Sequence, residues 1–96
     1  MAMEFMGETC TVVRAQYPNG RTALRLVSVT GEPLAMATVN IPEVELDADL
    51  VIIKDHSENA GMVDALVAGG IVSEPVSLVE APFVTYPVCR LKEVVS

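Results

Sequence analysis

The sequence predicts an α+β domain, in which a curved antiparallel sheet or half-open barrel of five to six strands holds a single helix at about residues 56–69. Three observations support this prediction. Most apolar residues fall in short strand-like runs, turn-forming residues such as Asn19-Gly20 separate the runs, and only one stretch has helical spacing. The 96 residues form one small domain, 1–96, whose residues 1–8 are expected to be disordered or to derive from cloning.

Turn residues and prolines bound the expected strands. Pro18-Asn19-Gly20 suits a tight turn between the first two strands, because Asn and Gly accept positive φ. Imperfect alternation in the second strand indicates a bulge or burial on both faces. Pro87, inside the last strand, indicates a bulge or an edge position. The expected strands are residues 9–17, 21–29, 34–41, 51–53, 76–79 and 83–91.

The predicted helix has clear start and stop signals. Asp55 or Ser57 caps its first turn, and Glu58 follows Asp55 by three residues, as in a capping box. Gly69-Gly70 ends it, since glycine accepts the left-handed conformation. A helix of three to four turns is unstable alone and must lay its apolar stripe on the sheet. The stripe consists of Met62, Val63, Leu66 and Val67.

Composition and charge limit the cell compartments and the classes of binding partner that are expected for this chain. The net charge is −7, which argues against direct binding to nucleic acid or to anionic membranes. No apolar run approaches the ~20 residues that span a bilayer, and no secretory signal is visible, so a cytoplasmic location is expected. Cys10 and Cys89 are then expected to be thiols packed in strands, the alternative being a disulfide between the first and last strands.

The residue types argue against an enzyme. Asp55-His56-Ser57 contains the residues of a catalytic triad, but three successive side chains point in different directions and cannot form the relay. One histidine and two distant cysteines do not meet the spacing of a zinc site, so no metal and no cofactor is expected. Gly69-Gly70 follows a helix and therefore lacks the helix N-terminus that binds phosphate.

The acidic residues are concentrated in one window. Between residues 43 and 64 there are seven acids and one base, Lys54. Residues 43–50 alternate strictly between acidic and apolar, which favours an extended segment with one acidic face, although two aspartates disfavour a regular strand and allow part of it to be a loop. The window is either a solvated face or a surface that binds a partner. The candidate partner-binding residues are Glu43, Glu45, Asp47, Asp49, Asp55, Glu58 and Asp64.

The chain also resembles a family of small bacterial proteins of uncharacterised function that phages, plasmids and other mobile elements often carry. Residues 54–61 carry the resemblance most clearly, followed by the short apolar helix and Gly-Gly-Ile-Val at 69–72. The segments 17–24, 37–42, 83–84 and 87–91 fit as well, so the resemblance covers about residues 11–91. Family members often have Tyr at the place of His56, and the resemblance brings no catalytic residues.

Three functions are expected, in this order. The first is a non-enzymatic interaction protein, an accessory factor of a mobile element or an inhibitor of a host defence, whose acidic surface binds a protein with a basic, nucleic-acid-binding site. The second is a structural module that forms a homodimer through a sheet edge. The third is a small-ligand binder or enzyme.

Overall fold

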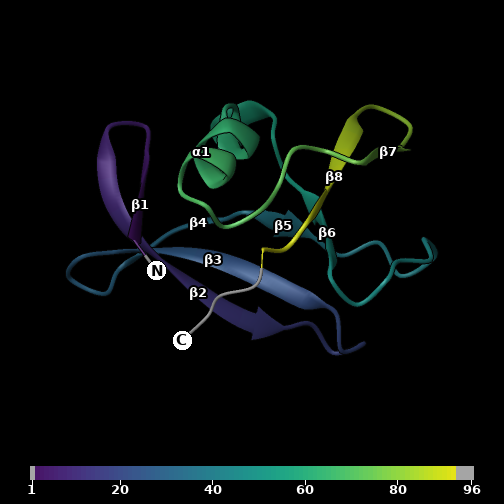
Figure 1. Ribbon diagram of the computed structural model, residues 1–96, viewed down its shortest axis with the longest axis horizontal. Coiled ribbons are helices and arrows are strands. Elements are labelled where there is room, and N and C mark those ends of the chain that lie inside the picture. Colours follow the sequence, from purple (N-terminus) through teal and green to yellow (C-terminus); the bar gives the residue numbers. More distant parts are fainter. Residues whose placement is uncertain (1, 93–96) are drawn as a thin grey trace.

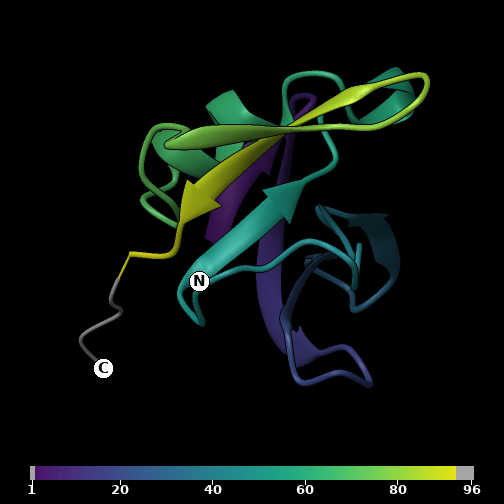
Figure 2. The ribbon, with the colours of Figure 1, turned by 90° about the vertical axis from the view of Figure 1, so that its right-hand side faces the viewer.

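The computed structural model describes residues 2–92, which form two four-stranded antiparallel sheets and one α-helix (Figures 1 and 2). The N-terminal sheet has the strand order β1-β2-β3-β4, and the C-terminal sheet has the order β5-β6-β8-β7. The α+β class is as predicted, whereas the expected single sheet of five to six strands is two open sheets. The elements are β1 (Ala2–Phe5), β2 (Glu8–Gln16), β3 (Thr22–Ser28), β4 (Pro33–Met36), β5 (Thr38–Val39), β6 (Leu50–Ile53), η1 (Ser57–Asn59), α1 (Met62–Ala68), β7 (Ser77–Glu80) and β8 (Thr85–Arg90).

The N-terminal segment is an ordered strand, so the expected disorder over residues 1–8 is wrong for residues 2–8; Met1 lies outside the described residues. Met3 and Phe5 lie on either side of Glu4, and β1 pairs with β2 from Ala2↔Thr11 to Phe5↔Glu8. Met3 is 5% exposed and belongs to the core. The turn between the strands consists of Met6 and Gly7, both with positive φ (53° and 79°), as tight hairpins require.

The chain passes from one sheet to the other at Ala37, which splits the expected strand 34–41 into β4 and β5. The Ala37 N–H donates to the Leu24 carbonyl, and the Ala37 carbonyl accepts from the Lys54 N–H, both at 2.8 Å. This fully buried residue is therefore bonded to both halves of the structure.

Strand β8 is central in its sheet, so the edge position expected for Pro87 is wrong. β8 lies between β6 and β7. The β6–β8 pairing ends at Ile52↔Val88, one residue before the position where Pro87 would have to donate a hydrogen bond to β6. As predicted, the apolar run 51–53 is fully buried in β6.

The helix is shorter than the predicted 56–69 and its start differs. The segment begins with η1, and Gly61, at φ 92°, is the N-cap of the seven-residue α1. The expected capping box is not formed. Instead, Asp55, which precedes η1 in the chain, accepts a hydrogen bond from the Val63 N–H at 3.3 Å, and Glu58 forms an ion pair with Lys54 at 2.8 Å. The buried residues of α1 are Met62, Val63 and Leu66, all from the predicted stripe.

Candidate functional site

The acidic loop, residues 40–49, joins β5 to β6 and does not form the extended row that alternation predicted for residues 43–50. Two turns fold it: Val44 N–H donates to the Ile41 carbonyl, and Leu50 N–H donates to the Asp47 carbonyl, both at 3.1 Å. Pro42 and the aspartates disfavour a strand here, and this preference prevails over the alternation. The carboxylates therefore do not repeat along one strand face.

Two arginines from distant strands hold the acidic loop in place. Arg21, just before β3, donates from Nη1 to the Ile41 carbonyl at 2.7 Å and from Nη2 to the Val44 carbonyl. Arg90 of β8 forms an ion pair with Asp49 at the other end. A side-chain amide of the β2–β3 turn adds a bond to the first residue of the loop. The loop is thus held by bonds near both of its ends, while the side chains of Glu43, Glu45 and Asp47 are exposed.

The seven candidate acids do not form one surface. Glu43, Glu45 and Asp47 are exposed on the acidic loop and form no ion pair within residues 2–92. The remaining four are Asp49, paired with Arg90; Asp55, bonded to the Val63 N–H; Glu58, paired with Lys54; and Asp64, exposed on α1. Figure 1 places the acidic loop at the right and α1 at the upper left, so the first three acids are separated from those around the helix.

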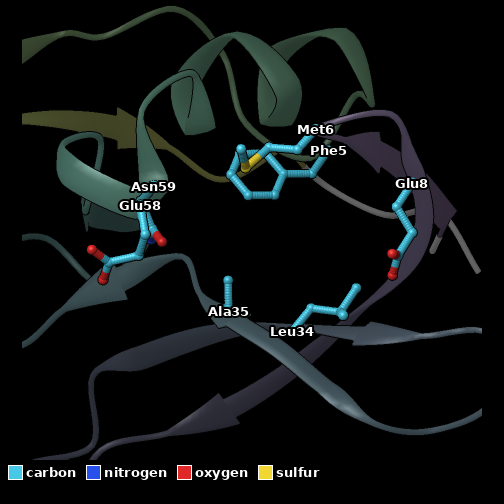
Figure 3. Close-up of a pocket in the computed structure, with 7 residues that line it drawn as sticks. All are labelled: Phe5, Met6, Glu8, Leu34, Ala35, Glu58 and Asn59. Atoms are coloured by element: carbon cyan, nitrogen blue, oxygen red, sulfur yellow. The ribbon is translucent and has the colours of Figure 1, made fainter.

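A groove of about 300 Å³ opens elsewhere, between the Met6–Gly7 turn, β4 and η1. Figure 3 shows the side chains of Phe5 and Met6 over one side of it, with Leu34 and Ala35 on the other. The carboxylates of two glutamates flank this apolar space, one from β2 and one from η1. They belong to Glu8 and Glu58.

Asn59 fixes the end of the groove at η1. Its side chain is 2% exposed, and Nδ2 donates to the Met36 carbonyl at 2.7 Å. Because Met36 lies in β4, which is an edge strand of the N-terminal sheet, this bond joins η1 to the sheet edge. The groove therefore has a fixed wall at this end.

The residues of the Asp55-His56-Ser57 stretch take separate positions in the fold. His56 lies edge-on to the Tyr86 ring, with 5.6 Å between the ring centroids, and its Nδ1 is buried with no partner in this part of the chain. No group of three or more His, Cys, Asp or Glu side chains in the described ranges is placed to hold a metal ion. Asp55 accepts the Val63 N–H of α1 at 3.3 Å.

The two cysteines are free and fully buried, in different sheets. Burial is the main cause that raises the pKa of both thiols, and it raises the pKa of Cys89 to about 11. At neutral pH they are therefore protonated and poor nucleophiles. By contrast, the hydrogen bond from Lys54 lowers the pKa of Glu58, so that carboxylate is charged at neutral pH.

Comparisons with protein-family models, with curated proteins and with solved structures found no match to the chain. The resemblance to proteins of mobile elements stays a prediction. In the described part of the chain, no helix has both the length and the apolar character needed to cross a membrane.

Sequence reasoning missed Arg21 and the residues around the groove. The role of Arg21 depends on carbonyls 20 and 23 positions away, which no local pattern reveals. The groove had a weak signal: Met3 and Phe5 alternate before Gly7 in the manner of a hairpin strand.

Proposed function

We propose that the protein is a non-enzymatic interaction protein whose acidic loop binds a basic site on a partner protein. The observation that supports this proposal most directly is the combination of charge and fixed shape in one segment. Glu43, Glu45 and Asp47 are exposed without ion-pair partners within residues 2–92, while Arg21 and Arg90 hold the loop on either side.

Fixed carboxylates bind better than mobile ones. A loop that is already ordered loses little conformational entropy on binding, and its charges attract a basic surface over about 8–10 Å at physiological salt. A loop that served only solubility would need the charges but not the two arginine anchors.

The partner that fits this loop is a protein with a basic, nucleic-acid-binding surface. Carboxylates at such a surface compete with phosphates for the same lysines and arginines. The predicted resemblance to mobile-element proteins makes a host defence enzyme of the restriction or CRISPR type the first class to examine, in the cytoplasm of a bacterial host.

A pull-down from such a host, followed by binding measurements across a salt series, tests the proposal. The variant that carries Glu43→Gln, Glu45→Gln and Asp47→Asn should fold normally and lose most of its affinity. The matched control removes three exposed charges outside the loop and should bind like the parent, with the same weakening at high salt. It carries Glu4→Gln, Glu32→Gln and Glu74→Gln. Equal loss of affinity in both variants would show that net charge, and not the loop, drives binding.

A second candidate function, homodimerisation, has its own support. β7 is an edge strand, and its outer edge pairs with no strand in the described chain. Leu78 on this strand is 67% exposed, and Val76 beside it is 52% exposed. An apolar edge without lysine or an internal proline is open to pairing with another strand. In sedimentation, the parent should then be a dimer and Leu78→Lys a monomer. A monomeric parent would contradict this function.

A further inference from the structure

The groove beside the Met6–Gly7 turn is formed by two unfavourable local features. Met6 has φ 53°, in the left-handed region that is unfavourable for a residue with a side chain, and Asn would fit this turn position better. Leu34 lies where the β3–β4 register shifts, between the pairs Leu26↔Ala35 and Val27↔Pro33. The extra residue of this shift lies on β4, whereas the bulge was expected in the second strand, 21–29; bulges redirect side chains.

Both features place apolar side chains at the groove and in solvent. Met6 is 77% exposed and Leu34 is 42% exposed, although a polar residue would be tolerated at either position by the fold alone. Strain that persists at an exposed site is a reason to look for a binding role. The side chains of Phe5 and Ala35 extend the same apolar lining between them (Figure 3).

Charge at the two ends of the groove selects the occupant. Glu8 is exposed and has no ion pair in the described chain, and the Glu58 side chain is 70% exposed even though Lys54 contacts one of its oxygens. An apolar group that enters between two carboxylates is favoured when it carries cations on both sides. At about 300 Å³ the space suits one or two apolar side chains, at the lower limit of pockets that enclose small ligands.

We propose that this groove takes an apolar side chain from a segment of a partner protein that has Lys or Arg on both sides of it. A second copy of the chain does not supply this segment. Its own stretches with basic residues on both sides of a leucine, 21–25 and 90–92, are already held in the fold. Leu24 is buried in β3, and Leu91 N–H donates to the Asp49 carbonyl at 2.7 Å. The inference is independent of the acidic loop, which lies on the other side of the molecule in Figure 1.

The test uses a short synthetic peptide with adjacent leucines at its centre and lysines at both ends. The protein carries ¹³C-methyl methionine, so that NMR reports each methionine separately. The Met6 methyl signal should shift on titration. The signal of Met62, which is fully buried at the start of α1, should not shift. A copy of the peptide with glutamates in place of lysines should bind at least about tenfold more weakly, a loss of ~1.4 kcal/mol.

Variants separate binding from folding. Met6→Asn should keep or raise the melting temperature, because Asn adopts the left-handed region more easily, and should weaken peptide binding about tenfold. Leu34→Ser should weaken binding to a similar extent. Val29→Ser, which changes an exposed apolar residue outside the groove, is the matched control and should bind like the parent.

Three results would overturn the proposal. The first is no Met6 shift at about 1 mM of the lysine peptide, the weakest affinity that a specific site of this kind would have. The second is equal binding of the lysine and glutamate peptides, which would indicate a non-selective apolar surface. The third is unchanged binding in both Met6→Asn and Leu34→Ser. Loss of partner binding in the acidic-loop variant affects none of these readings.

Discussion

Replacing Arg21 with alanine separates the shape of the acidic loop from its charge. The variant retains Glu43, Glu45 and Asp47 and becomes one unit more negative. If charge alone attracts the partner, Arg21→Ala should bind more tightly than the parent. If the fixed loop matters, it should bind more weakly, because both guanidinium bonds to the loop backbone are lost.

The structure sets the size of the stability loss expected for Arg21→Ala. Hydrogen bonds from a charged donor contribute about 1.5–3 kcal/mol each, but Arg21 is half-buried and the freed carbonyls of Ile41 and Val44 regain water. We therefore expect a total loss of about 2 kcal/mol in the free energy of unfolding. A domain with roughly 5–15 kcal/mol of stability remains folded after such a loss. Because the loosened loop must be ordered again on binding, affinity should fall about tenfold.

The assay combines urea unfolding, amide hydrogen exchange and partner binding. The Val44 amide, bonded to the Ile41 carbonyl, should exchange faster in Arg21→Ala while amides in β6 keep their protection. Arg25→Ala is the matched control, because Arg25 is exposed on β3 and its side chain makes no hydrogen bond or ion pair within the described part of the chain. Identical Val44 exchange in the two variants, together with equal or tighter binding by Arg21→Ala, would refute the role of loop shape.

Three further substitutions test the packing, the helix start and the buried thiol. Leu66→Ala should cost about 2–5 kcal/mol, because Leu66 is fully buried, and an unchanged thermal midpoint would contradict its anchoring role. Asp55→Ala should cost about 1 kcal/mol in urea unfolding, because the Val63 N–H loses its acceptor, whereas Asp64→Ala should not. Burial raises the pKa of Cys89 from 9.0 to about 11, so the unfolded thiol ionises first. The free energy of unfolding should therefore be unaffected by this group below pH 9 and should fall by about 1.4 kcal/mol per unit between pH 9 and pH 11. Cys89→Ala should lack this part of the pH dependence, and equal slopes in the two proteins would contradict it.

Local patterns predicted the elements better than their assembly. The apolar run 51–53 and the stripe around Leu66 were visible, because burial patterns act over a few residues. The register shift between β3 and β4 places its extra residue, Leu34, on β4 and not in the second predicted strand. Gly61 lies inside an otherwise helical pattern, and its left-handed conformation, which the pattern does not indicate, separates η1 from α1.

Long-range bonds account for the features that could not be predicted. The division into two sheets depends on Ala37 bonding to Leu24 on one side and Lys54 on the other, and nothing in the sequence near Ala37 indicates this. The acidic residues were identified from composition, but their separation into an acidic loop and a helix-proximal group follows from turns and from ion pairs with distant partners. Whether they bind a partner stays a prediction.

The strand order also determines when each sheet can form during synthesis. In the N-terminal sheet every strand pairs with the next one along the chain, so this sheet is complete once β4 has emerged. β6, by contrast, takes its central partner from β8, which begins at Thr85. At about 5–20 residues per second, the apolar residues of β6 wait roughly 2–6 s for that partner. Conditions that prolong this interval should therefore lower the yield of soluble protein in cells even where the finished fold is equally stable.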